Sequence, residues 1–160
     1  MKPEEFFQKL QPLFKQLQVP DIEMNPQGYY TFMLETGQIF LELTEVDTMV
    51  MLSFIPLPEK LTTDLLLELL QANLTPDQPS RVILAADKED KRLCLWIDIT
   101  TDKIYVEELY AMLEQLNITM RIISRWFEET EKEKQAGQQA NQRNIEKSKQ
   151  AEAMLNQRRR

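Results

Sequence analysis

The chain has 160 residues, of which 42% are hydrophobic, so it is long enough for one domain with its own core. Its net charge of −7 is uneven, because residues 131–160 hold eight basic and four acidic residues, while the remainder holds 11 basic and 22 acidic residues. An acidic body repels nucleic acid, and no stretch reaches the roughly 20 apolar residues of a membrane span. The first residues lack a signal-peptide core and Cys94 has no disulfide partner, so we expect a cytoplasmic protein without a nucleic-acid partner.

The residue types that support most enzyme chemistry are missing. The chain contains no histidine, one cysteine and three scattered glycines, which excludes catalytic triads, imidazole and all-cysteine metal sites, and glycine-rich phosphate loops. Cys94 lies on an apolar strand and is interpreted as a packed thiol. We therefore expect no catalytic residue, no metal, no cofactor and no enzyme activity.

The first segment, residues 3–19, predicts an amphipathic helix. Pro3 and the acidic pair that follows it are typical of a helix start, and apolar residues recur at helical spacing from Phe6 to Leu17. Phe7 and Phe14 widen this apolar face. Pro12 removes a backbone donor, so we expect a kink or a late start.

Residues 29–58 predict three antiparallel strands. The first two alternate cleanly, with Tyr30, Phe32 and Leu34, then Ile39, Leu41 and Leu43, on the inner face. The third, within "DTMVMLSFIPLP", is apolar on both faces. We assign Val50, Leu52 and Phe54 to the helix side, and Met49, Met51 and Ile55 to an outer face that awaits a partner. Methionine is flexible and polarizable, which suits an irregular partner.

The second half of the chain predicts a helix, a hairpin and a long helix. "TTDLLLELLQANL" is apolar nearly all round, which indicates burial on more than one side, and we expect another subunit to cover the second side. "SRVILAA" and "RLCLWIDIT" form a hairpin across a charged loop. The spacing of apolar residues from Val106 to Phe127 is that of a helix laid over the sheet, with a coiled coil as the alternative. The polar residues after 130 predict a tail or a solvated helical extension.

The predicted fold class is therefore α+β, in the order α-β-β-β-α-β-β-α, with one twisted antiparallel sheet, helices packed on it and a polar tail. We expect a domain of residues 1–130 and a basic tail or helical extension of residues 131–160.

This order resembles the class I type III secretion chaperones of the Tir-chaperone (CesT-like) family. The residues that carry the resemblance are the "LLLELLQANL" helix, the "SRVILAADKEDKRLCLWIDIT" hairpin and the "EELYAMLEQL…RW" helix, and the match covers roughly residues 3–129. The resemblance implies a bacterial cytoplasmic homodimer that binds the N-terminal region of a secreted effector as an extended chain and keeps it export-competent. It also implies that the effector adds a strand to the sheet.

The resemblance assigns two sets of residues. The expected effector-binding residues are Phe7, Phe14, Met33, Phe40, Met49, Met51 and Ile55, and the expected dimer interface is Leu66, Leu70, Val82 and Leu84. Pro12 and the long basic tail depart from the family pattern. The tail is a candidate for docking to the secretion apparatus, and a heterodimer with another chaperone is an alternative to the homodimer.

Two other interpretations of the sequence remain open. The first is a non-catalytic α+β interaction or regulatory module without a secretion client. The second is a coiled-coil adaptor that assembles through the residues 106–127 and the tail.

Overall fold

The computed structural model describes residues 1–19, 22–44, 47–59, 61–74 and 81–157, and within the last helix it describes few side chains beyond residue 132. Its elements follow the predicted order: α1 (Pro3–Gln16), β1 (Tyr29–Leu34), β2 (Gly37–Leu43), β3 (Thr48–Pro56), α2 (Thr63–Gln71), β4 (Ile83–Asp87), β5 (Arg92–Thr100) and α3 (Val106–Gln157). Two short 3-10 helices, Ala72–Leu74 and Thr101–Lys103, follow α2 and β5. The α+β fold class is confirmed.

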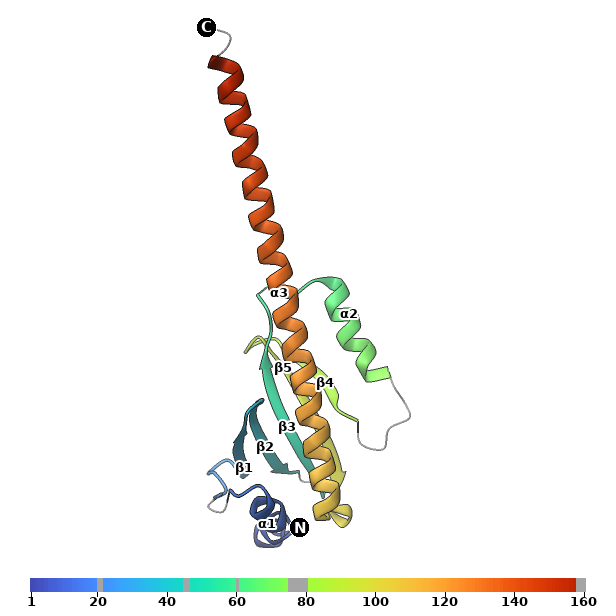
Figure 1. The fold of residues 1–160 in the computed structure, drawn as a ribbon. Helices are drawn as coiled ribbons and strands as arrows, with labels where there is room; N and C mark the ends of the chain where they lie inside the picture. Colours follow the sequence, from blue (N-terminus) through green and yellow to red (C-terminus); the bar gives the residue numbers. More distant parts are fainter. Residues whose placement is uncertain (20–21, 45–46, 60, 75–80, 158–160) are drawn as a thin grey trace. The chain divides into compact units, whose positions relative to one another are not determined.

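The five strands form one antiparallel sheet in the order β1-β2-β3-β5-β4, so β1 and β4 are its edges (Figure 1). The register aligns whole rows of side chains across the sheet. Met51 lies opposite Leu41 of β2 and Ile97 of β5, whereas Leu52 lies opposite Phe40 and Trp96. Each row therefore belongs entirely to one face.

One face of the sheet forms the core. Its buried side chains are Tyr30, Phe32, Ile39, Leu41, Met49, Met51, Ser53, Ile55, Leu84, Leu93, Leu95 and Ile97. Helices α1 and α3 cover this face: Phe14 contacts Tyr30 and Phe32, and the methyl group of Met120 approaches Gly37 in the β1–β2 hairpin. Ser53 is polar but satisfied, because its hydroxyl donates to the carbonyl of Gln38 at 2.7 Å.

The third strand has the opposite orientation from the one expected. Met49 and Met51 are fully buried and Ile55 is nearly so, whereas Val50, Leu52 and Phe54 are half-exposed on the other face. The physical reason lies in the neighbouring strands, since Met49 lies opposite Ile99 while Val50 lies between two charged residues, Glu42 and Asp98. The prediction that Met49, Met51 and Ile55 face outward is wrong.

Helix α1 begins where its sequence signals predict. Pro3 occupies its first turn, the Glu5 carboxylate accepts a hydrogen bond from the Lys2 backbone N–H at 3.3 Å, and Pro12 lies inside the helix. Of the two effects expected from Pro12, the late start is wrong, because buried Phe6, Leu10 and Leu13 hold the helix on the core from its first turn. The kink stays a prediction. The Lys9 ammonium donates to the carbonyl of Thr101 at 2.7 Å and ties α1 to the segment before α3.

Helix α2 is anchored on the sheet edge through Asn73. Its side chain makes two hydrogen bonds with the backbone of Leu84, one donated and one accepted, each 2.9 Å long. Thr62 caps the start of α2 by accepting from the Leu65 N–H. Leu65 and Leu69 are buried, which leaves the opposite side of the helix exposed.

The chain comprises two structural units, residues 1–124 and residues 125–160. Helix α3 passes from the first unit into the second. In the first unit its buried residues are Leu109, Met112, Leu113, Leu116, Met120 and Ile123, which confirms the helix-on-sheet interpretation of this segment. The second unit continues as helix to Gln157, with Trp126 stacked on Phe127. The domain division at residue 130 stays a prediction, and the terminal arginines lie outside the described residues.

Candidate protein-binding site

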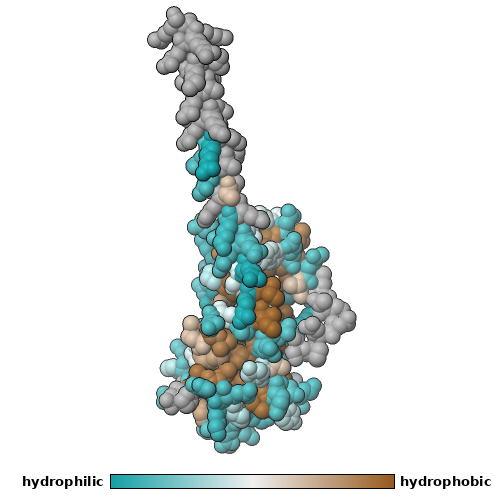
Figure 2. Space-filling model, viewed as in Figure 1, coloured by the Kyte–Doolittle hydropathy of each residue, from teal (hydrophilic) through white to brown (hydrophobic). Residues whose placement is uncertain are grey.

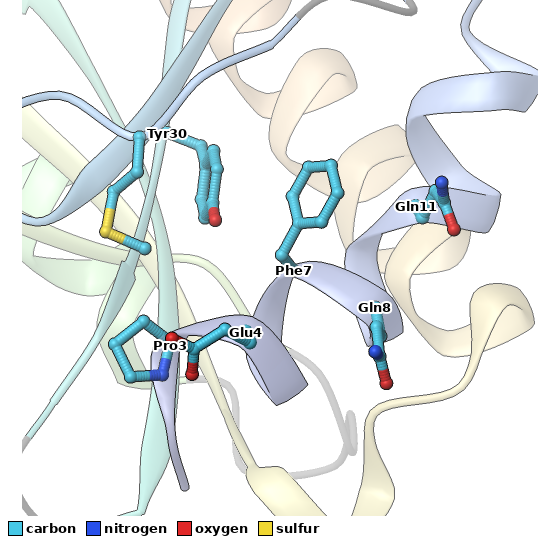
Figure 3. Close-up of a pocket in the computed structure, with 7 residues that line it drawn as sticks. Pro3, Glu4, Phe7, Gln8, Gln11 and Tyr30 are labelled. Atoms are coloured by element: carbon cyan, nitrogen blue, oxygen red, sulfur yellow. The ribbon is translucent and has the colours of Figure 1, made fainter.

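A groove runs along the exposed side of α1. It consists of two adjoining hollows of about 470 and 650 Å³ that share Phe7 and Gln11. Pro3, Glu4, Gln8, Met24 and Tyr30 complete the first hollow, and Pro12, Phe14, Lys15 and Gln18 complete the second. In the close-up, Phe7 from α1 and Tyr30 from β1 point toward each other, with Gln8 and Gln11 further along the helix (Figure 3).

An aromatic cluster forms the floor of this groove. The ring centroid of Phe7 lies 5.9 Å from that of Tyr30 and 6.4 Å from that of Phe14, and Phe14 lies 5.7 Å from Tyr30. Burial raises the pKa of the Tyr30 hydroxyl above its usual value. A tyrosine is neutral at physiological pH even without this shift. The rim carries glutamines and one charge of each sign, Glu4 and Lys15. A neutral aromatic floor with such a rim suits an apolar side chain from a partner better than an ionic ligand.

The free edge of β1 lies next to the groove. In an antiparallel edge strand, alternate residues direct both backbone groups away from the sheet. Tyr29 belongs to that set, because its N–H donates to the Asn25 side chain and its carbonyl accepts from the Asn25 N–H. Thr31 and Met33 follow at two-residue steps, and among the described residues no hydrogen bond occupies their outward backbone groups. This edge therefore offers a place where a partner strand can pair.

The face of the sheet opposite the core is also apolar. It carries Tyr29, Met33, Phe40, Val50, Leu52, Phe54, Cys94, Trp96 and Ile83. All are half-exposed except Met33, which is 68% exposed. Phe40 contacts both Tyr29 and Phe54, with each pair of ring centroids 5.5 Å apart. We call this surface the outer sheet face.

Helix α2 presents a third apolar surface. Leu66, Leu67 and Leu70 are 39%, 56% and 59% exposed. The space-filling view shows hydrophobic surface beside α2 and α3, and a second area over the strands (Figure 2). Such exposed apolar surfaces mark protein–protein contacts more often than catalytic sites.

The described residues offer no group of three or more histidine, cysteine, aspartate or glutamate side chains that would hold a metal ion. In the same residues, no helix is long and apolar enough to cross a membrane. Cys94 is half-buried, and burial raises the pKa of its thiol, which disfavours the reactive thiolate. The surfaces that stand out are thus suited to binding protein segments.

The family model of the Tir chaperone protein (CesT) family matches residues 8–122. This chain belongs to that family. The match includes all five strands, α2 and most of α1, and therefore contains the edge of β1 and the outer sheet face. It contains only part of the groove, because Pro3, Glu4 and Phe7 precede residue 8.

Three solved structures illustrate the similarity of the fold. A chain of the ExsC–ExsE complex aligns with a TM-score of 0.68 and 13% identity, over 78% of this chain and 95% of that one. A chain of the Yersinia pestis type III secretion chaperone SycH in complex with a fragment of YscM2 aligns with a TM-score of 0.62 and 18% identity, over 73% and 98%. A chain of the heterodimeric ExoU–SpcU complex from the type III secretion system of Pseudomonas aeruginosa aligns with a TM-score of 0.58 and 21% identity, over 74% and 98%. No curated protein matches the sequence.

The expected effector-binding residues fall into three groups. Phe7 and Phe14 line the α1 groove together, although Phe14 is only 3% exposed. Met33 and Phe40 lie on the outer sheet face, as expected. Met49, Met51 and Ile55 lie in the core of this single chain and are not available at its surface.

The residues of the expected dimer interface fall into an exposed pair and a buried pair. Leu66 and Leu70 are exposed on α2, whereas Val82 and Leu84 are buried behind it. The sequence interpretation missed Tyr30 and Met24 in the groove, and Leu52, Phe54 and Trp96 on the outer sheet face. Glu42 and Asp98 could have indicated the correct orientation of β3. They lie opposite Val50, and charged residues mark the face of the sheet that meets water.

Proposed function

We propose that this protein is a type III secretion chaperone that binds the N-terminal region of a secreted effector in extended form and keeps it soluble and export-competent in the bacterial cytoplasm. Membership of the chaperone family supports this proposal, as do similar structures of complexes such as HopA1–SchA and ExoT–SpcS. We assign no catalytic role and no cofactor.

The observation that carries the proposal is the position of the α1 groove beside the edge of β1, whose outward backbone groups at Thr31 and Met33 have no hydrogen-bond partner among the described residues. Tyr30 belongs to both features, since it lines the groove and lies between the edge positions of Tyr29 and Thr31. An extended segment on this edge gains backbone hydrogen bonds that do not depend on its sequence, while its side chains enter the groove and provide selectivity. Each buried apolar side chain contributes roughly 1.5–3 kcal/mol before ordering costs.

The proposal is tested with a pair of variants at Thr31. Thr31→Pro removes an edge N–H that β2 does not use, and Thr31→Ala keeps that N–H while removing the same side chain. Both lose the hydrogen bond that the Gln38 amide donates to the Thr31 hydroxyl. Strand addition predicts that the proline variant retains its fold and loses effector binding, while the alanine variant binds normally.

The binding measurement uses the tagged protein isolated from its native cytosol and analysed by native mass spectrometry. We expect a complex of two chaperone chains with one secreted protein, held through the N-terminal region of that protein. Phe7→Glu should abolish this complex, whereas Gln16→Glu, an equal charge change on an exposed position outside the groove, should not. Recovery of a free monomer, or equal binding by Phe7→Glu and wild type, would contradict the proposal.

We further propose that two copies meet through α2, with exposed Leu66 and Leu70 in contact and Val82 and Leu84 supporting them from below. Leu70→Glu should convert the dimer to a folded monomer in size-exclusion chromatography. Gln71→Glu introduces the same charge at the neighbouring exposed position and should leave the dimer intact. A heterodimer with another chaperone would appear in the same experiment as a second chain of different mass.

A further inference from the structure

The outer sheet face carries a continuous apolar band across four strands. One row runs through Phe40, Leu52, Trp96 and Ile83, and the next contains Phe54, Cys94 and Ala85. The side chains of the first row are all half-exposed, and the contact of Phe40 with Phe54 joins the two rows. A single chain thus leaves a flat apolar surface several side chains wide in contact with water.

Beneath the three inner strands of this band, the backbone is already engaged within the sheet. Strands β2, β3 and β5 each have a neighbour on both sides, so their N–H and C=O groups bond within the sheet. A partner that lies on this face cannot share those groups, in contrast to one that pairs with the edge of β1. It must satisfy its own backbone while it presents apolar side chains, and an amphipathic helix meets both requirements.

The charges that border the band are acidic. Glu42 and Asp98 are exposed on either side of Val50, on adjacent strands, roughly 10 Å apart across the sheet. Neither forms an ion pair within the part of the chain that the structure describes. Their two charges lie about one Debye length apart at physiological salt, so one cation above Val50 interacts with both.

The single cation on the described strands of this face is neutralised by its neighbours. Arg92 pairs with Asp87 at 2.9 Å and with Asp90 at 2.8 Å, and its guanidinium lies 3.8 Å from the centre of the Phe54 ring. Two of its nitrogens face carboxylates and one of its planar faces covers a ring, so it adds little positive potential to the band. The net field above the apolar rows favours basic groups.

We propose that the outer sheet face binds an amphipathic helical segment of the client in which lysine or arginine residues flank an apolar stripe. This inference rests on the proposed chaperone function, because it names the chemistry of a second client segment beyond the one at the β1 edge. The apolar stripe covers Phe40, Leu52 and Trp96, and the basic flank meets Glu42 and Asp98.

The probes are two synthetic amphipathic peptides of about five helical turns that share one leucine stripe. All positions outside this stripe are lysine in one peptide and glutamate in the other. Cys94 is the reporter, because it is the only cysteine of the chain and lies within the band. The lysine peptide should slow alkylation of Cys94, and the glutamate peptide should have no effect at the same concentration.

Charge-reversal variants separate this site from general attraction to an acidic protein. Glu42→Lys/Asp98→Lys should weaken binding of the lysine peptide by roughly tenfold and make it less sensitive to salt. Glu107→Lys/Glu114→Lys changes the net charge equally at exposed positions of α3, on the other side of the sheet, and should weaken binding far less. Equal losses in the two variants, or binding that leaves Cys94 unprotected, would overturn the inference.

The same variants distinguish the failure of this inference from the failure of the proposed function. If the native client still binds and depends on Phe7 but not on Glu42 and Asp98, the chaperone function stands and the basic helical segment is refuted. If no client is recovered with the wild-type protein, the function fails, whatever the peptides do.

Discussion

Met51 and Leu52 are neighbours on β3, yet Met51 is fully buried between Leu41 and Ile97 while Leu52 is half-exposed between Phe40 and Trp96. The strand is apolar on both faces because each face meets a different kind of contact. The face of Met51 packs on the helices of its own chain. The face of Leu52 remains open for a partner.

This arrangement predicts unequal costs for truncation. Met51→Ala should lower the free energy of unfolding by about 2–5 kcal/mol, because it leaves a cavity in the core. Leu52→Ala should cost less than about 1.5 kcal/mol, since its side chain is already in contact with water. Urea denaturation measures both values, and a larger loss for Leu52→Ala would show that the two faces are reversed.

The sequence was sufficient for the order of elements but not for the orientation of β3. Alternation defines a face only where apolar and polar residues differ, as in β2, where Ile39 and Leu41 alternate with Gln38 and Glu42. Residues 49–55 are apolar on both sides except for Ser53, so the orientation depended on the register with neighbouring strands. That register is a tertiary property. The lining of the groove could not be predicted from the sequence for the same reason, because Met24 and Tyr30 come next to Phe7 only in the folded chain.

At Gly37 the first hairpin lies close to α3, which leaves no room for a side chain. Its φ angle is +147°, and a Cβ atom at this position would lie 2.8 Å from the methyl carbon of Met120. Gly37→Ala should therefore destabilise the protein by about 1–3 kcal/mol, through both backbone strain and crowding. Denaturation of Gly37→Ala, Met120→Ala and the double variant separates the two causes.

Crowding predicts that Gly37→Ala costs less in the Met120→Ala background than in the wild type. Gly28→Ala is the matched control, because Gly28 also has a positive φ angle, +92°, but has no atom within 4 Å of an added Cβ. An unchanged cost at Gly37 after the removal of Met120 would mean that backbone strain alone is responsible.

The stability that the Asp87 carboxylate contributes to the fold should be lost in acid. Its carboxylate accepts hydrogen bonds from the Arg92 side chain at 2.9 Å and from the backbone N–H of Asp90 at 3.3 Å, and these hold its pKa below the usual value. A group with a lowered folded-state pKa contributes stability that is fully present above its unfolded pKa and is lost as the pH falls through the folded value. Asp87→Asn should therefore be less stable than wild type at neutral pH, and the difference should disappear in acid.

Urea denaturation across a pH series measures this difference, which should begin to shrink below about pH 5. Arg92→Gln removes the main cause of the shift, so it should abolish most of the pH dependence that Asp87 contributes. A difference that stays constant down to the lowest pH would show that Asp87 acts only through the shape of the hairpin.

The thiol of Cys94 should react slowly with thiol reagents in the native protein. Burial is the main cause that raises the pKa of its thiol, and the positive charge of Arg92 opposes this shift. At pH 8 the native protein should react with a thiol reagent at least about tenfold more slowly than the unfolded chain, because less thiolate is present and access is restricted. Phe54→Ala removes the side chain opposite Cys94 and should accelerate the reaction, while Arg92→Gln should slow it further. A native rate equal to the unfolded rate would contradict the raised pKa and the restricted access. A native rate above the unfolded rate would show an activated thiol, and Cys94 would then have to be reconsidered as a nucleophile rather than as part of a surface for binding protein.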